Sequence, residues 1–456
     1  MPVSFDLFYS YDELTALLHA WAEARPELVQ VESMGQSYEG RDIWLVTLTN
    51  AETGPSIEKP GFLIEANIHS VEWTGSTAAL HLIQRLVDGY GSDEKVTRLL
   101  DTRTMYVVPR LNPDGAEHAL QEGRFIRSSV RPYPTSEPEV RAMVQAVTER
   151  PNITGHIAYH TFSGVHLRPY AGRPDEEFPT QDLRAYKIIG ERGTELTGYP
   201  AVSVFHDFKY DPKMTIKGGA HDWMYDHLGV FSWTTEFWSP QRQAGLEDYH
   251  YTDWIREHPI EDDVALIRWA RERYPDAHVD WYEYDHPELG KVELGGWDII
   301  NYWFNVPFDQ LESEVAPHSE FALFHALISP LLEVRSLDVD QLGETSFLVR
   351  LVLQNSGWLP TNVSEKAVER KAVRDLEVEL ELPEGARLVG GDVKTEVGQL
   401  KGRVDKRSTT WWANDESTSD LAKLEWVVEA SAGTEIGLTA GNLRAGTIRR
   451  TLKLEA

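Results

Sequence analysis

The stretch FLIEANIHSVEWTG, from Phe62 to Gly75, decides the fold. Its first seven residues are rich in branched apolar side chains and follow Pro60 and Gly61, a pattern typical of a short buried strand. Helical spacing of apolar residues begins at Trp73, only a few positions later. A strand that leads directly into a helix predicts a unit of an α/β sheet.

The same alternation of strand and helix patterns continues on both sides of this stretch. Further strands are predicted at 41–50, 105–108, 153–159, 201–205 and 230–235, and helices at 10–25, 73–87, 137–150, 182–196, 262–274 and 311–328. Capping boxes are predicted at two helix starts, from Ser10 with Glu13 and from Ser136 with Glu139. The alternation predicts an α/β fold whose sheet is covered by helices on both faces.

The pattern changes after Ser329 and Pro330. Five segments (LEVRSLDV, SFLVRLVLQN, LEVELEL, KLEWVVEAS and TIRRTLKLEA) alternate apolar and polar residues and are separated by turns. Several short alternating strands predict a β-sandwich of Ig-like size, about 100 residues or slightly more. We therefore expect an α/β domain at 1–329 and an all-β sandwich at 330–456, whose role the sequence leaves open.

Composition excludes several classes of function. The chain has 456 residues, with 44 Lys and Arg against 73 Asp and Glu, so its formal net charge is −29. A surface of that sign repels nucleic acid and anionic lipid, and we expect neither as a partner. Because there is no cysteine, any metal ion must be held by histidine and carboxylate ligands.

The cellular location is predicted from what the first residues lack. Met1 to Tyr11 contain neither the basic segment nor the apolar run of a secretion signal, and no stretch approaches the ~20 apolar residues of a membrane span. We therefore expect a cytoplasmic protein without a membrane partner. The sequence gives no indication of the oligomeric state.

A metal site is predicted where strands end. His69 and Glu72 lie three residues apart at the entrance of a helix, so their side chains can point the same way, although the pair by itself favours a polar turn with Glu72 as an N-terminal helix charge. His160 ends the predicted strand ITGHIAYH, and open α/β sheets bind ligands at the carboxyl ends of their strands. Two histidines and one carboxylate leave one position open on zinc, which is typical of a catalytic site.

A general base is predicted from the strand VFSWTTEF. Glu236 is the only carboxylate in this apolar and aromatic run. Burial among Phe231, Trp233, Phe237 and Trp238 would raise its pKa toward neutrality, which suits a residue that accepts and then returns a proton. The alternative is a carboxylate on a solvated strand face.

Five segments together resemble the zinc carboxypeptidase family of the carboxypeptidase A and B type. They are NIHSVEWTG, VVPRLNPDG, SEPEVRA, HTFSGVHLRPY and GGAHDWMYDHLGVFSWTTEFW, in family order across about residues 8 to 270. The resemblance implies a mixed sheet and one Zn²⁺ per chain, held by His69, Glu72 and His160. It also implies that Glu236 activates the zinc water and that Arg127, in RFIRSSVR, stabilises the oxyanion.

Two parts of the family pattern are missing. No Asn-Arg pair lies between Arg127 and SEPEVRA, so the usual clamp on the substrate's terminal carboxylate is absent, and Arg131 or Arg168 is the candidate to replace it. Met214 occupies the place of the family's substrate-covering tyrosine, with Tyr210 as a possible substitute. His221 aligns with the base of the side-chain pocket, where a cationic imidazole would favour an acidic or polar terminal residue.

The resemblance implies a zinc metallocarboxypeptidase that hydrolyses the C-terminal peptide bond of peptides. Two alternatives remain open at this point. One is an amidohydrolase that cleaves N-acyl amino acids or peptide-like amides, which the missing clamp would permit. The other is a catalytically impaired member of the family that binds a peptide or a carbohydrate.

Overall fold

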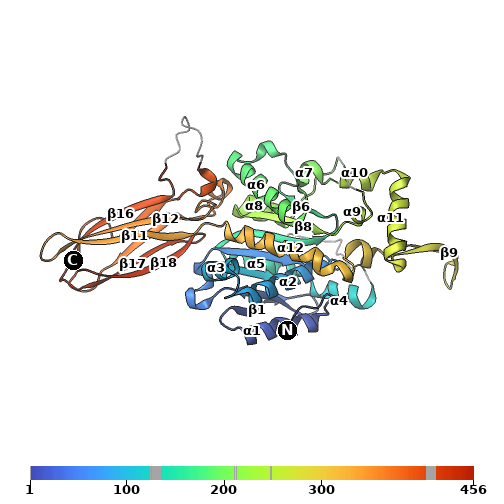
Figure 1. Cartoon of the computed structure of the whole chain (residues 1–456), viewed down its shortest axis with the longest axis horizontal. Helices are drawn as coiled ribbons and strands as arrows, with labels where there is room; N and C mark the ends of the chain where they lie inside the picture. Colours follow the sequence, from blue (N-terminus) through green and yellow to red (C-terminus); the bar gives the residue numbers. More distant parts are fainter. Residues whose placement is uncertain are drawn as a thin grey trace.

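The computed structural model describes residues 2–123, 125, 135–209, 211, 213–246, 249–406 and 417–455. The molecule is elongated (Figure 1). A large α/β body holds the N-terminus, and a pair of β-sheets that contains the C-terminus extends from one end of it.

One mixed sheet organises the α/β body. Its eight strands lie in the order β1-β2-β4-β3-β5-β8-β6-β7. They are β1 (Val29–Gln36), β2 (Asp42–Leu48), β3 (Gly61–Ala66), β4 (Thr104–Val108), β5 (Ile153–Thr161), β6 (Val165–Arg168), β7 (Ala201–Ser203) and β8 (Phe231–Phe237). Strands β4, β3, β5 and β8 run parallel to one another. Their carboxyl ends therefore meet at one edge of the sheet, where α/β proteins place their ligands.

Helices cover both faces of this sheet, which confirms the predicted fold class. The core on one face is formed with α1 (Tyr11–Ala24), α2 (Trp73–Gly89), α3 (Glu94–Thr102), α6 (Thr180–Thr197) and α12 (Phe308–Leu327). The core on the other face is formed with α5 (Pro138–Thr148) and α8 (Ala220–Leu228). Alternation along β3 divides its side chains accordingly: Phe62 and Ile64 belong to the first core and Leu63 to the second.

The remaining helices of the body lie around the ends of the strands. They are α4 (Pro113–Glu122), α7 (Val204–Asp207), α9 (Pro240–Gln243), α10 (Tyr251–Arg256) and α11 (Ile260–Arg273). The strand predicted at 201–205 ends early, because the Ser203 hydroxyl accepts a hydrogen bond from His206 N and caps α7. The capping box at Ser10 is present, whereas the one expected at Ser136 is wrong: Glu137 precedes α5 and no side chain caps it.

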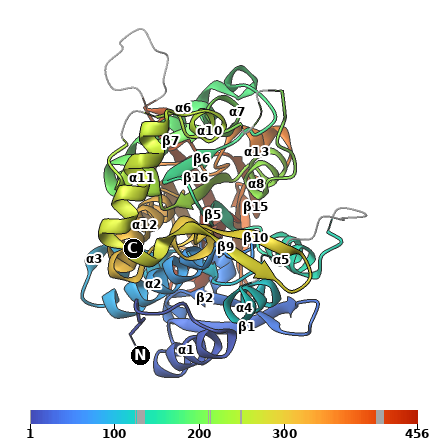
Figure 2. The same cartoon turned by 90° about the vertical axis from the view of Figure 1, so that its right-hand side faces the viewer.

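A hairpin that the sequence did not predict projects from the far end of the body. It consists of β9 (His278–His286) and β10 (Gly290–Trp297), followed by the π-helix η5 (Ile299–Phe304). It lies with α11 at the end of the molecule opposite the C-terminal sheets (Figures 1 and 2).

The C-terminal part consists of two four-stranded antiparallel sheets, as expected for a β-sandwich. One contains β11 (Leu332–Gln341), β12 (Ser346–Asn355), β16 (Leu421–Glu429) and β14 (Arg387–Gly390). The other contains β15 (Lys394–Gly398), β13 (Leu376–Glu381), β17 (Glu435–Asn442) and β18 (Gly446–Lys453). Alternate residues of each sheet share one apolar core, and the short helix α13 (Glu365–Glu369) contacts α8 of the body.

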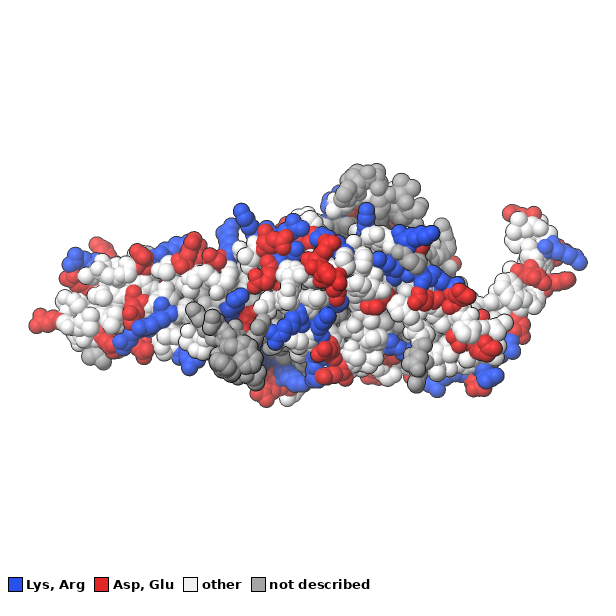
Figure 3. Space-filling view, turned by 90° about the horizontal axis from the view of Figure 1, so that it is seen from above, with Lys and Arg blue, Asp and Glu red and all other residues white. Residues whose placement is uncertain are grey.

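The surface carries both signs of charge. Lysine and arginine are interspersed with aspartate and glutamate over the face seen in Figure 3. Across the described ranges, no helix is both long enough and apolar enough to cross a lipid bilayer.

Candidate active site

The loop after β3 is built to present His69. Asn67 adopts a left-handed conformation (φ 57°), and its side-chain amide donates to His69 O at 2.7 Å. The Asn112 side chain donates to Ile68 O at 3.1 Å while its carbonyl caps α4 by accepting from Gly115 N at 2.9 Å. The turn that contains Asn112 therefore fixes the loop that carries His69.

Helix α2 begins in a way that leaves the Glu72 side chain free to face the histidines. Glu72 is the N-cap residue, but its carboxylate makes no capping hydrogen bond. Asn305 satisfies the buried first-turn amide of Thr74 instead, since its Oδ1 accepts from Thr74 N at 2.9 Å. Asn305 also donates to Val71 O at 2.7 Å and so ties η5 to the start of α2.

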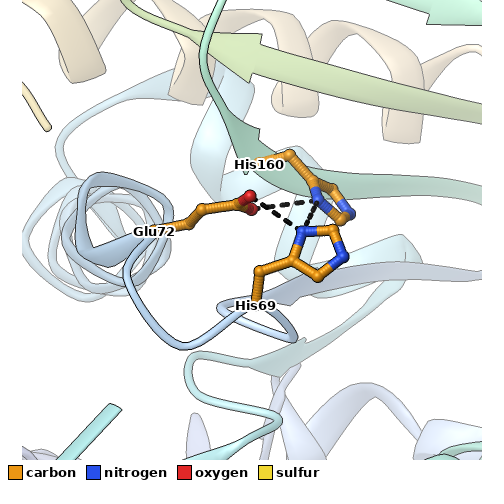
Figure 4. Close-up of side chains that lie close together, drawn as sticks. All are labelled: His69, Glu72 and His160. Atoms are coloured by element: carbon orange, nitrogen blue, oxygen red, sulfur yellow. Dashed lines mark hydrogen bonds and ion pairs between the residues drawn. The ribbon is translucent and has the colours of Figure 1, made fainter. Parts of the chain in front are cut away.

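The structure brings the three predicted ligands together at the carboxyl ends of β3 and β5 (Figure 4). Glu72 Oε1 lies 2.8 Å from His69 Nδ1, and Glu72 Oε2 lies 3.0 Å from His160 Nδ1. The two Nδ1 atoms lie 3.2 Å from each other. One atom of each residue thus points to a common centre, with Glu72 almost fully buried.

Burial and charge act in opposite directions on this cluster. Burial alone would raise the pKa of Glu72, but the two imidazoles lower it to about 2. Burial alone would lower the pKa of His160, but Glu72 and then Glu236 raise it to about 9. Without a metal, the site near neutral pH therefore holds a carboxylate paired with an imidazolium.

The donor set fits zinc. The Nδ1 atoms of His69 and His160 face each other, and only one proton fits between them. Both atoms also face the Glu72 carboxylate, so a cation between the three groups would bind all of them. Zn²⁺ binds His nitrogen and carboxylate oxygen at about 2.0–2.2 Å, so its tetrahedral ligands lie about 3.3 Å apart. The distances between the three ligand atoms are close to this value.

Glu236 lies beside this cluster but not in the surroundings predicted for it. Its position on β8 is paired with His160 on β5. Side chains alternate along a strand, and Phe231, Trp233 and Phe237 therefore point into the core on the opposite face. The prediction that these aromatic residues bury Glu236 is wrong, and its carboxylate is half-buried on the face of the cluster.

A second row of side chains lies on the same face, one step further into the sheet. Glu65, Ala158 and Thr234 are paired across β3, β5 and β8. Glu65 and His156, from a third row, line a cavity of about 850 Å³ between the sheet, α5 and α8. Burial raises the pKa of Glu65 to about 7 and lowers that of His156 to about 3.

His221 lies in the first turn of α8 and is buried. Its Nδ1 lies 3.0 Å from the Thr234 hydroxyl. Burial lowers the pKa of His221 from its usual value, with Asp222 opposing the shift. The expectation of a cationic imidazole here is wrong, because burial favours the neutral ring near pH 7.

The other predicted site residues divide into two groups. Arg127, Arg131 and Tyr210 lie outside the described residues. Arg168, the alternative carboxylate clamp, is buried and forms a bidentate ion pair with Asp175, both bonds being 2.7 Å long. Its guanidinium is therefore already neutralised, which argues against a clamp at this position.

Sequence reasoning missed Glu65 and the positioning role of Asn305. A signal for Glu65 was present, because it is a lone carboxylate within the apolar strand that precedes His69. No such signal exists for Asn305, which acts from a segment more than two hundred positions away.

Comparisons with known proteins show what the chain is similar to. The family model "Zinc carboxypeptidase" matches residues 14–133 and 127–252, and a model described as a domain of unknown function (DUF8731) matches 331–453. The chain is similar to a zinc carboxypeptidase of Saccharothrix mutabilis subsp. capreolus, with 23% identity over 54% of this chain and 65% of that protein. Carboxypeptidase A1 of Rattus norvegicus also matches with 23% identity over 54% of this chain and 65% of its own length.

The chain thus spans just under two thirds of the length of these relatives. Among solved structures, the carboxypeptidase A from Helicoverpa armigera is similar at 21% identity with a TM-score of 0.46. That match covers 60% of this chain and 76% of the other.

Proposed function

Because the chain belongs to the zinc carboxypeptidase family, we propose that it is a zinc-dependent metallocarboxypeptidase that hydrolyses the C-terminal peptide bond of peptides. One observation supports this more than any other. The ligand atoms of His69, Glu72 and His160 lie within 4.8 Å of one another, at the edge of the sheet where Glu236 also lies. These are the parts that hydrolysis of an amide requires.

His69, Glu72 and His160 would hold the ion through two Nδ1 atoms and one carboxylate. Zinc bound there supplies a Lewis acid that polarises the scissile carbonyl and makes a water molecule easier to deprotonate. The strong hydrogen bonds of the loop around Asn67 and Asn112 hold the ligands in place before an ion arrives.

Glu236 would move the proton. Its carboxylate accepts a proton from the water that attacks the carbonyl carbon, and then gives that proton to the nitrogen as the carbon–nitrogen bond breaks. Position supports this role, because Glu236 lies next to His160 without belonging to the ligand cluster.

Three further residues complete the proposal. Arg127 would stabilise the negative charge that develops on the carbonyl oxygen, and Arg131 would contact the terminal carboxylate. Neutral His221, held by Thr234, would line the pocket of the released residue.

Glu236→Gln tests the proposed base. The variant removes the proton acceptor but keeps the shape of the side chain, so zinc content should stay at the wild-type value while kcat falls by about 10²- to 10⁴-fold. The measurement is release of terminal residues from a peptide mixture, with zinc determined on the same samples. Glu149→Gln, which removes an exposed carboxylate at the C-cap of α5, is the matched control and should be fully active.

Peptides with a free and an amidated C-terminus should be compared in the same assay. A carboxypeptidase releases residues from the free acid much faster than from the amide. Equal rates would favour the amidohydrolase, and wild-type turnover in Glu236→Gln would remove Glu236 from the mechanism.

A further inference from the structure

Another cavity lies where the α/β body meets the C-terminal sheets, at the end of α12 that leads into β11 (Figure 1). Its volume is about 510 Å³, which is within the range of small-molecule sites. Helices α3, α6 and α12 line it from the body, and residues 356–358 and Arg403 line it from the C-terminal part. A ligand bound here would therefore contact both parts of the molecule.

The walls of this cavity carry an excess of positive charge. Among the described residues that line it, five are cationic and one is acidic: Lys95, Arg98, Arg103, Arg192 and Arg403 against Glu320. Acidic residues outnumber basic ones in the chain as a whole, whose formal net charge is −29. The excess of cations is therefore a local feature of the cavity and does not follow from the composition of the chain.

Most of these cations have no carboxylate partner. Arg192 pairs with Glu195 at 2.6 Å, and the one acidic lining residue, Glu320, is engaged by Arg85 at 3.1 Å. Neither Glu195 nor Arg85 lines the cavity. Within the described ranges, three exposed lining cations form no ion pair: Lys95, Arg98 and Arg403.

Arg103 brings a further positive charge into the interior of the same cavity. It is 1% exposed, and its guanidinium donates to neutral groups, namely Ser329 Oγ and O, both at 3.0 Å, Thr102 Oγ1 at 2.9 Å and Leu327 O at 3.4 Å. These four bonds leave one N–H of Nη1 without an acceptor among the described residues. Burial and the nearby charge of Arg98 lower the pKa of Arg103 to about 9, so both oppose its positive charge.

The rest of the wall is apolar. It is formed by Leu196, Leu323, Phe324, Leu327, Ile328 and Trp358. Apolar walls lower the local dielectric constant, which strengthens both the repulsion among the cations and their attraction to an anion. An anion in the cavity would relieve the repulsion and supply an acceptor for Arg103.

We propose that this cavity binds a small, multiply charged anion that carries at least two phosphate groups. Each phosphate group has about 1.5–2 negative charges near pH 7, so two of them match the four cations that lack a carboxylate partner. Guanidinium groups bind phosphate oxygens through paired N–H donors, and a lysine adds a compact charge. The cavity shares no lining residue with the proposed metal centre, so the inference is independent of the proposed function.

Equilibrium dialysis against labelled pyrophosphate and labelled ADP, without Mg²⁺, tests the proposal. At least one probe should bind the wild-type protein at one site per chain. A tighter complex with ADP points to an organic diphosphate as the ligand, and a tighter complex with pyrophosphate points to the inorganic anion. Because binding stabilises the folded state alone, the same probe should also raise the Tm.

The double variant Arg98→Gln/Arg403→Gln removes two exposed charges of the cavity and should weaken binding at least tenfold. Arg98→Lys/Arg403→Lys keeps the charges and should retain more of the affinity than the Gln variant. The matched control is Arg268→Gln/Arg450→Gln, which removes two exposed arginines of α11 and β18 outside the cavity and should bind as the wild type does. Circular dichroism shows whether each variant is folded.

Two results overturn the proposal directly: neither probe binds the wild type, or the cavity variant loses no more affinity than the control. His160→Ala separates this site from the proposed metal centre and should bind the probe as the wild type does. Loss of binding in His160→Ala would place the anion at the metal centre and so overturn the proposal. Absence of zinc or of peptide hydrolysis, by contrast, leaves the predicted anion binding unchanged.

Discussion

The protonation of His160 depends on its two close neighbours in the site, because its Nδ1 faces both His69 Nδ1 and the Glu72 carboxylate. The metal-free cluster holds one proton on His160 at neutral pH because its pKa is about 9. Imidazole binds a metal only in its neutral form. Zinc must therefore displace this proton.

The first prediction concerns that proton. Between pH 6 and 8, below the His160 pKa, binding of one zinc ion should release at least one proton, and the apparent affinity should rise about tenfold per pH unit. Glu72 releases no proton in this range, since its pKa of about 2 keeps it a carboxylate. Calorimetric titrations in buffers of different ionisation enthalpy count the protons, and a count of zero at pH 7 would contradict the geometry described for the cluster.

Helix α12 provides a prediction at the scale of one element. His325 is buried against Phe62 and Phe321, with ring centroids 4.8 and 6.1 Å away. Neither ring nitrogen has a hydrogen-bond partner in the described structure, and burial lowers the pKa of His325 to about 3. In the unfolded chain the same group titrates near 6.5.

His325→Phe should therefore flatten the acid sensitivity of the protein. Between about pH 6.5 and 3 the unfolded wild-type chain binds a proton at His325 that the folded protein does not, so the free energy of unfolding falls as the pH falls. In His325→Phe the unfolded chain has no group at this position that can bind a proton. Urea denaturation at pH 7.5 and pH 5 measures the effect: the variant should lose less stability between the two pH values, and an equal loss in both proteins would refute this account.

Patterns within one element were the most predictable part of the fold. The alternation in SFLVRLVLQN predicted β12 over its observed range, and Ser10 with Glu13 predicted the start of α1. The cluster of ligands was predictable for a similar reason, because parallel strands bring their carboxyl ends together wherever they lie in the sequence.

Relations between elements were less predictable. The surroundings of Glu236 were misjudged because its sequence neighbours are not its spatial neighbours on a strand. The expected cap at Ser136 failed because the chain places Glu137 at the N-cap instead. Hairpin β9–β10 has exposed residues on both strands, so little of the usual contrast between a buried and a solvated face marks it in the sequence.

At the scale of the whole molecule, the C-terminal sheets support the cavity wall formed by α8. Arg444 is 3% exposed, and its guanidinium donates to Leu228 O, Gly229 O and Asn362 O. Two of these carbonyls lie at the C-terminal end of α8, where a positive charge is favourable. Arg370 adds a hydrogen bond of 2.8 Å to Asp226 on the same helix.

Arg444→Met should consequently destabilise the protein by about 2–4 kcal/mol, because it leaves several buried carbonyl groups without a donor. Arg449→Met is a matched control, since Arg449 also reaches the α/β body but pairs with Glu58 at the surface. Exposed ion pairs are worth about 0–1 kcal/mol, and the control should lose no more than that. Denaturant unfolding of both variants measures the difference, and equal losses would show that Arg444 does not anchor α8.

The central claim is that His69, Glu72 and His160 hold one zinc ion on which peptide hydrolysis depends. The most direct test determines zinc per chain in the wild type and in His160→Ala, together with release of C-terminal residues with and without a chelator. We predict one zinc and chelator-sensitive release in the wild type, and neither in His160→Ala. Stoichiometric zinc in His160→Ala, or release that a chelator does not affect, would contradict the claim.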